Sequence, residues 1–143
     1  MFLSLEDYID FLPIGFEYIV CGQAAAKLLG LTSVVPLLSI YSTEELFQKT
    51  KIMNYKKPDL KNIRTTKILN RITCTTTEQT IVDMLQGELA LDPQVLPESL
   101  AMLISDSENG TYDITRLEEY ARETGVWNQY LEAKRDSEDF WSE

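Results

Sequence analysis

Residues 71–87, RITCTTTEQTIVDMLQG, carry three successive threonines and two acidic residues where a strand pattern gives way to a helix pattern. Carboxylates can act as general acid and base, which makes Glu78 and Asp83 candidates for catalysis. In a helix, however, residues five positions apart do not share a face. The two carboxylates are therefore poorly placed to act together on one substrate.

The threonines of this stretch are predicted to hold the start of the helix. Thr75 is followed three residues later by Glu78, and Thr76 by Gln79, which is the spacing of a capping box before an apolar run. In a capping box the hydroxyl accepts a hydrogen bond from a backbone N–H group that has no partner within the helix. An acidic residue in the first turn also meets the positive end of the helix dipole. We therefore assign Thr75, Thr76 and Glu78 a structural capping role.

The residue types of the chain exclude several kinds of active site. The sequence contains no histidine, so it offers no imidazole base for a serine or cysteine nucleophile and no His-containing zinc site. A metal would need a shell of carboxylates, for which Asp83, Glu88 and Asp92 are the candidates. Cys74 closely follows Arg71, but a strand cysteine that points inward is normally inert. No glycine-rich phosphate-binding loop is present, and we expect no catalytic residue, no cofactor and no metal.

The charge of the chain is strongly uneven. Its formal net charge is −10, yet residues 49–71 carry a local charge of +7 with Asp59 as their only acid, which leaves −17 for the rest. The basic residues of this stretch are Lys49, Lys51, Lys56, Lys57, Lys61, Arg64, Lys67 and Arg71. Such a distribution favours electrostatically steered docking to a partner. The alternative is that these side chains are solvated and protect exposed strand edges.

The length of the chain and its 44% of apolar residues predict one globular domain over residues 1–143. The stretches with strand character are short and follow one another along the chain. They cover residues 34–42, 51–57, 62–69 and 71–75. Because only short turn sequences separate them, they predict an antiparallel four-stranded meander, with the basic residues mainly on its polar face and turns.

Helices are predicted before and after these strands, so the expected fold class is α+β, with N-terminal helices, a small meander and C-terminal helices packed on it. Apolar residues at helical spacing mark residues 4–12, 23–31, 97–105 and 114–136, the last interrupted at Gly125, in addition to the capped helix that ends at Gly87. Phe140 and Trp141 lie in an acidic tail and are expected to dock on this domain. The alternative is that they dock on another molecule.

The sequence also bears on location. No run approaches the roughly 18 apolar residues that span a bilayer, and the N-terminal stretch MFLSLEDYIDF has early acids and no basic region, unlike a secretory signal. Cys21 and Cys74 lie 53 positions apart and lack a metal-ligand spacing, which favours free thiols in a reducing compartment. We expect a cytoplasmic protein that does not contact a membrane.

Two segments carry a family resemblance. Residues 21–31, CGQAAAKLLGL, precede the first predicted strand, and residues 72–86, ITCTTTEQTIVDMLQ, close the predicted sheet. Together with the later ESLAMLI they resemble the AbiEi-family antitoxins of bacterial abortive-infection systems, over about residues 16–105. The second segment lacks the proline of the family motif and has Gln79 where the family usually has arginine. The matching residues are Ala25, Leu28, Gly30 and Leu31 in the first segment and Thr76, Thr77, Glu78, Thr80, Val82, Asp83 and Leu85 in the second.

The resemblance divides the chain into a leading helix (residues 1–15), the region of likeness (16–105) and C-terminal helices with an acidic tail (106–143). It implies a non-catalytic antitoxin that neutralises a nucleotidyltransferase-like toxin in a phage-defence toxin–antitoxin system. Members of the family often repress their own operon through an N-terminal winged helix, for which the leading residues are too few. We expect the basic stretch 49–71 to contact the toxin and the acidic C-terminal helices to offer a second contact. The alternative is a transcriptional regulator that binds nucleic acid through the same basic stretch.

Overall fold

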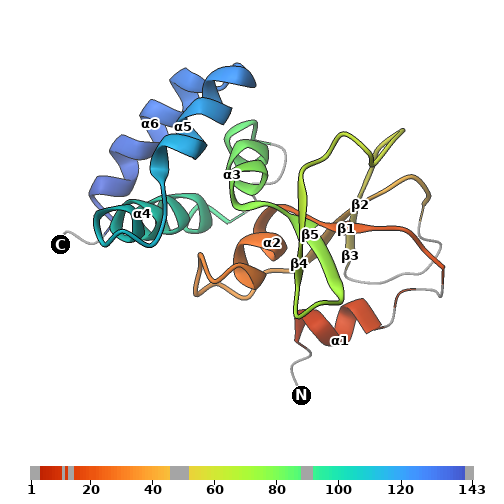
Figure 1. Cartoon of the computed structure of the whole chain (residues 1–143). Helices are drawn as coiled ribbons and strands as arrows, with labels where there is room; N and C mark the ends of the chain where they lie inside the picture. Colours follow the sequence, from red (N-terminus) through yellow and green to blue (C-terminus); the bar gives the residue numbers. More distant parts are fainter. Residues whose placement is uncertain (1–3, 11, 13–14, 46–51, 88–91, 141–143) are drawn as a thin grey trace.

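The computed structural model describes residues 4–10, 12, 15–45, 52–87 and 92–140. A five-stranded mixed sheet lies on one side of the molecule, and the C-terminal helices lie on the other side (Figure 1). The strands are β1 (Ile19–Val20), β2 (Leu38–Ser42), β3 (Ile52–Lys56), β4 (Thr65–Ile68) and β5 (Ile72–Thr75), in the spatial order β3-β2-β1-β5-β4. In the described residues the helices are α1 (Leu5–Asp10), α2 (Gly22–Leu28), α3 (Thr77–Leu85), α4 (Val95–Glu108), α5 (Ile114–Glu123) and α6 (Trp127–Glu138).

The structure is α+β, but the predicted antiparallel four-stranded meander is wrong. The short strand β1 lies at the centre of the sheet, antiparallel to β2 and parallel to β5. The edge strand β3 is parallel to β2, so within the described residues β4 and β5 are the only two of the four predicted strands that pair antiparallel with each other. A strand of two residues is too short to show the alternation by which strands are recognised. The segment that contains it therefore carries no strand pattern in the sequence, and the four longer strands were predicted to pair consecutively.

The connection between β3 and β4 shows how far the topology departs from a meander. These two strands are the opposite edges of the sheet, so residues 57–64 cross over its whole width (Figure 1). Leu60 and Ile63 of this crossover pack against Ile19, Cys21 and Tyr41. The crossover thus covers one face of the sheet and supplies a small core of its own.

The opposite face of the sheet is covered by α1 and α2. Its core contains Val20 from β1, Ile40 from β2 and Ile72 from β5, each without exposed surface. Ala24 and Ala25 of α2 are equally buried there. Their small side chains allow the helix to approach the strands closely. Alanine also has a strong helix propensity, which favours a helix in this segment.

A second core joins α3 to the C-terminal helices. Ile81 and Met84 of α3 pack with Leu100 of α4, Leu117 of α5 and Tyr130 of α6, all of which are buried. Because α3 follows β5 directly, the same helix ends the sheet and begins the helical layer. Among the described residues, no helix is long and apolar enough to pass through a lipid bilayer.

The position of β1 can be tested by hydrogen exchange. The amide of Cys21, which follows β1, donates to the carbonyl oxygen of Ser39 at 3.0 Å. We expect this amide to exchange more slowly than the amides of Asp59 and Asn62, which donate no hydrogen bond within the described residues, by a factor of about 10³ or more, because it opens only with the sheet. Nuclear magnetic resonance can measure both rates. Equal rates would contradict the central position of β1.

Candidate functional site

The junction between β5 and α3 is built from threonines. Thr76 is the N-cap residue of α3, and its Oγ1 accepts a hydrogen bond from the Gln79 amide at 3.2 Å. Thr75 is the last residue of β5 and is buried, with its hydroxyl 2.6 Å from that of Thr80. The Thr80 hydroxyl also donates to the carbonyl oxygen of Thr76. These bonds fix the turn from strand to helix inside the protein, where unpartnered backbone groups would be costly.

The two acidic side chains of α3 have different partners. Glu78 is only 9% exposed, and its Oε2 accepts a hydrogen bond from the Tyr112 hydroxyl at 2.7 Å. Asp83 is 6% exposed, and its Oδ1 accepts from Nε2 of Gln79 at 2.8 Å. Oε1 of Gln79 in turn accepts from the hydroxyl of Tyr120. Both carboxylates thus belong to hydrogen-bond networks, and the Glu78 and Gln79 networks join α3 to residues around α5.

The tyrosines of these networks are held in their protonated form. Burial raises the pKa of Tyr112, and the hydrogen bond and charge of Glu78 raise that pKa further. Burial likewise raises the pKa of Tyr120, while the nearby Arg64 lowers it in part. A phenol with a raised pKa remains a hydrogen-bond donor over the physiological range. The arrangement is suited to holding α5 against α3.

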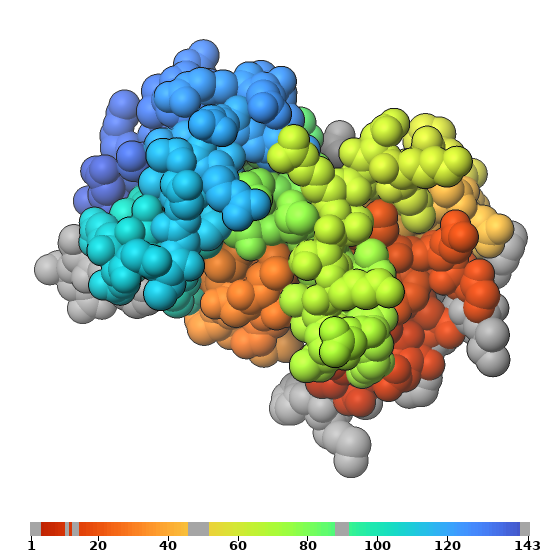
Figure 2. Space-filling model, viewed as in Figure 1, coloured from red at the N-terminus to blue at the C-terminus, as the bar shows by residue number. Residues whose placement is uncertain are grey.

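Arg64 ties the crossover to this junction. Its guanidinium lies 3.9 Å from the centre of the Tyr120 ring and 3.5 Å from Oε2 of Glu123, while its backbone carbonyl accepts from the Thr76 amide. Figure 2 shows the surface of the crossover meeting that of the C-terminal helices. A polar cleft of about 140 Å³ lies here, lined by Arg64, Glu78, Arg116, Glu119, Tyr120 and Glu123. Its arginines and carboxylates have opposite charges, so the cleft does not concentrate charge of one sign.

The basic residues singled out from the sequence do not form one uniform surface. Lys49 and Lys51 lie outside the described residues. Arg71 pairs with Asp10 at 3.3 Å, and the ammonium group of Lys57 lies 5.0 Å from the centre of the Tyr41 ring. Arg64 is engaged at the junction, as described above. The remaining basic side chains of the stretch, those of Lys56, Lys61 and Lys67, are exposed.

Two of these lysines share a face of the sheet. Ile68 packs with the α1–α2 core, so its neighbour Lys67 points to the opposite face, the one that the crossover covers. Lys61 belongs to the crossover itself. Lys56 follows Tyr55, which packs with the crossover, and therefore points to the α1–α2 side.

The cysteines and the candidate metal ligands have the following environments. Burial raises the pKa of Cys74 to about 11, and burial together with the charge of Asp83 raises that of Cys21. Both thiols are free and buried, an environment that disfavours the reactive thiolate. Glu88 lies outside the described residues, within which no three acidic, cysteine or histidine side chains gather as a metal site.

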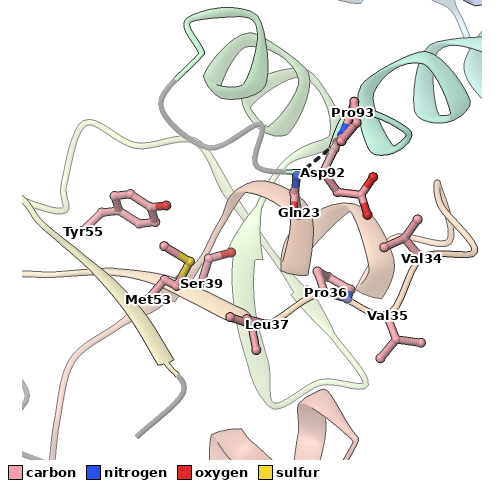
Figure 3. Close-up of a pocket in the computed structure, with 10 residues that line it drawn as sticks. All are labelled: Gln23, Val34, Val35, Pro36, Leu37, Ser39, Met53, Tyr55, Asp92 and Pro93. Carbon is pink, nitrogen blue, oxygen red and sulfur yellow. Dashed lines mark hydrogen bonds between the residues drawn. The ribbon is translucent and has the colours of Figure 1, made fainter. Parts of the chain in front are cut away.

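A hollow that the sequence did not reveal lies beside β3 (Figure 3). It has a volume of about 300 Å³, and the side chains of Ser39, Met53 and Tyr55 line it along the sheet. The segment Val34–Leu37 forms one wall, and the Asp92–Pro93 turn contributes to another. Because these residues come from four separate parts of the chain, no local sequence pattern marks them. The side chains of Val35 and Leu37 are 69% and 51% exposed.

Glu98 of α4 holds the segment that leads into this wall. It is buried, and its carboxylate accepts hydrogen bonds from the Thr32 hydroxyl, from the Ser33 amide at 2.8 Å and from the Ser33 hydroxyl at 2.9 Å. Burial alone would raise the pKa of Glu98, but these hydrogen bonds outweigh it and lower the pKa. The ionised carboxylate therefore stabilises the position of this segment.

Two comparisons with known proteins found no relative of this chain. No model of a known protein family matches the sequence, and a search of curated protein sequences found no match either.

Removing the Tyr112 hydroxyl tests the Glu78 network. Tyr112→Phe leaves the buried carboxylate of Glu78 without this donor, so we expect a loss of about 1–3 kcal/mol in the free energy of unfolding. The matched control is Tyr8→Phe, because the ring of Tyr8 packs against the α1–α2 core, and we expect a change within about 0.5 kcal/mol there. Urea unfolding measures both. Equal effects of the two substitutions would contradict a specific role for the Tyr112–Glu78 bond.

The lowered pKa of Glu98 predicts a stability that depends on pH. The ionised carboxylate of Glu98 contributes fully to the free energy of unfolding above the unfolded pKa of glutamate, about 4.3. This contribution is lost as the pH falls through the lowered pKa of the folded state. We expect Glu98→Gln to cost about 1–3 kcal/mol at pH 7, with the difference from wild type shrinking as the pH falls towards 3. Urea unfolding at several pH values measures this difference. A difference that stays constant with pH, as expected for the exposed control Glu138→Gln, would contradict the assignment.

Proposed function

We propose that this chain acts in the cytoplasm by binding another protein, and that this partner is the nucleotidyltransferase-like toxin of a phage-defence toxin–antitoxin pair. The observation that carries the proposal is the exposure of two lysines on the side of the sheet that the crossover covers, Lys61 of the crossover and Lys67 of β4, which we call the basic face. Neither ammonium group takes part in a hydrogen bond or ion pair within the described residues. Exposed cations on an otherwise strongly acidic chain favour steered association with an acidic surface of a partner.

The chemistry of the junction supports binding as the activity. The buried carboxylates of Glu78 and Asp83 accept hydrogen bonds from within the protein. Arg64, which lines the polar cleft together with Glu78, stacks on Tyr120. These groups stabilise the arrangement of α3 and α5, which leaves the exterior of the molecule for recognition.

The resemblance to AbiEi-family antitoxins contributes the identity of the partner. In this chain the matching residues of the second motif are Thr76, the N-cap, and buried residues of α3 such as Thr80 and Val82. They are residues that build the junction between sheet and helices. The resemblance therefore concerns the scaffold, and the contact with a toxin is expected on the surface of that scaffold.

A nucleic-acid-binding regulator would use the same basic face. Binding through phosphate groups is strongest at low salt, and its dependence on salt becomes steeper with the number of phosphates that the protein neutralises. No binding of an arbitrary DNA duplex or of RNA at about 50 mM salt would eliminate the regulator. Binding to the duplex with a steep salt dependence, and none to the toxin, would replace the antitoxin proposal by the regulator.

The toxin interface can be tested by reversing the two exposed charges. The proposal expects a nucleotidyltransferase-like toxin to be encoded beside this chain. With that toxin as the partner, the double variant Lys61→Glu/Lys67→Glu should weaken binding by about tenfold or more and fail to rescue growth of cells that express the toxin. Calorimetry and a growth assay measure the two effects.

The matched control is Lys27→Glu in α2, on the other face of the sheet. This variant carries the same kind of charge reversal and should bind and rescue like the wild type. Unchanged toxin binding by the double variant would contradict the proposed contact surface. If the wild-type chain neither binds nor neutralises the toxin, the antitoxin function itself is wrong.

A further inference from the structure

The two edges of the sheet differ in character. On β4, the residues Thr65, Thr66 and Lys67 are polar and exposed, as is usual for an edge that must avoid pairing with other chains. On β3, the residues from Ile52 to Tyr55 are half-buried, and three of the four are apolar or aromatic. Within the described residues β3 pairs with β2 alone. Among these residues, its outer side therefore presents backbone donors and acceptors next to an apolar surface.

The hollow beside β3 continues this apolar surface. Met53 and Tyr55 alternate along the strand and so share the face on which the hollow lies (Figure 3). Val35 and Leu37 project from the opposite wall and remain largely exposed. A volume of about 300 Å³ is at the lower limit for small-molecule pockets, and it suits one or two apolar side chains of a bound strand.

The two ends of the hollow differ in charge, with basic groups near one end and an acidic group at the other. Beyond Tyr55, its neighbour Tyr41 carries the ammonium group of Lys57 over its ring, 5.0 Å from the ring centre. Lys61 adjoins Leu60, which packs with the same aromatic residues. At the other end of the hollow stands the acidic side chain of Asp92. A bound segment is therefore favoured when its acidic residues lie at the Tyr55 end and its uncharged residues lie at the Asp92 end.

We infer that β3 and the hollow beside it form a docking site for an extended segment of a protein partner. The segment adds to β3 as a sixth strand, places apolar side chains against Met53, Tyr55 and Leu37, and directs its acidic residues towards Lys57 and Lys61. Backbone hydrogen bonds supply affinity in this mode, and the pockets for alternate side chains supply specificity. The inference rests on the proposed function in taking the partner to be a protein, and it names the kind of segment that the site holds.

The probe for this site is a fluorescein-labelled hexapeptide in which two isoleucines, separated by one threonine, are followed by three glutamates. A second peptide has the reversed order, because the segment can run parallel or antiparallel to β3. Fluorescence anisotropy measures binding of each peptide to the full chain. We expect one of the two orientations to bind, and its backbone N-methylated form, which cannot donate the strand hydrogen bonds, to bind at least about tenfold more weakly.

Two substitutions with matched controls locate the site. Leu37→Glu should weaken peptide binding by about tenfold or more, since it places a charge in the hollow, whereas Leu131→Glu on α6, a residue 42% exposed, should have no effect. Lys57→Gln should weaken binding, and Lys67→Gln on the opposite edge strand should not. Thermal unfolding of each variant confirms that it is folded, as the exposure of Leu37 leads us to expect.

Each outcome decides the inference separately from the proposed function. Binding of one orientation that is abolished by N-methylation and by Leu37→Glu supports it. No binding of either peptide at about 1 mM, or equal binding of the N-methylated form, overturns it even if the toxin binds. Peptide binding that Leu37→Glu abolishes, in a chain that does not bind the toxin, supports the docking site while the toxin proposal fails.

Discussion

Between Thr75 and Thr76 the backbone leaves β5, an interior strand of the sheet, and starts helix α3 inside the protein. At such a place every backbone N–H and C=O group needs a partner. The side chain of Thr76 supplies one acceptor, and the Arg64 carbonyl, from the end of the crossover, supplies another for the Thr76 amide itself. The strand that ends here pairs with β1 and β4, and the helix that starts here packs in the second core. This turn of the backbone therefore joins the two halves of the fold, together with α2, whose Ala26 packs in the second core.

This constraint explains why the acidic residues of α3 are engaged within the protein. A helix that lies between a sheet and a helical layer has little surface left for solvent, so carboxylates on it must be hydrogen-bonded. Tyr112 satisfies Glu78, and Gln79 connects Asp83 to Tyr120. The positive part of the charge asymmetry is then expressed elsewhere, on the crossover and β4, whereas α5 and α6 each carry three acidic and two basic residues. Recognition through the exterior is the activity that this distribution favours.

The sequence predicted the helices and the four longer strands at nearly their observed positions, because each carries its own periodicity. The break at Gly125 between α5 and α6 follows from the same local rules, since that glycine has a φ of +76°. The order of the strands was not predictable in this way. It depends on Ile19 and Val20, two residues whose pairing partners lie far along the chain.

The partners of the candidate site residues were equally hidden from the sequence. Glu78 was predicted as a helix cap, but its hydrogen bond to Tyr112 spans 34 positions. The hollow beside β3 brings together four segments, and Glu98 positions one of them from a helix 65 residues away. Interactions of this kind follow from tertiary packing, so local spacing carries no trace of them.

We expect the junction between β5 and α3 to make the sheet and the C-terminal helices unfold as one cooperative unit. Trp127 of α6 packs against the second core, so tryptophan fluorescence carries a signal from the helical side. Hydrogen-exchange labelling of the β2 amides reports on the sheet. Urea unfolding of the wild-type protein followed by both probes should give coincident transitions with the same midpoint. Separate midpoints for the tryptophans and for β2 would show that the two halves unfold independently and would contradict the account.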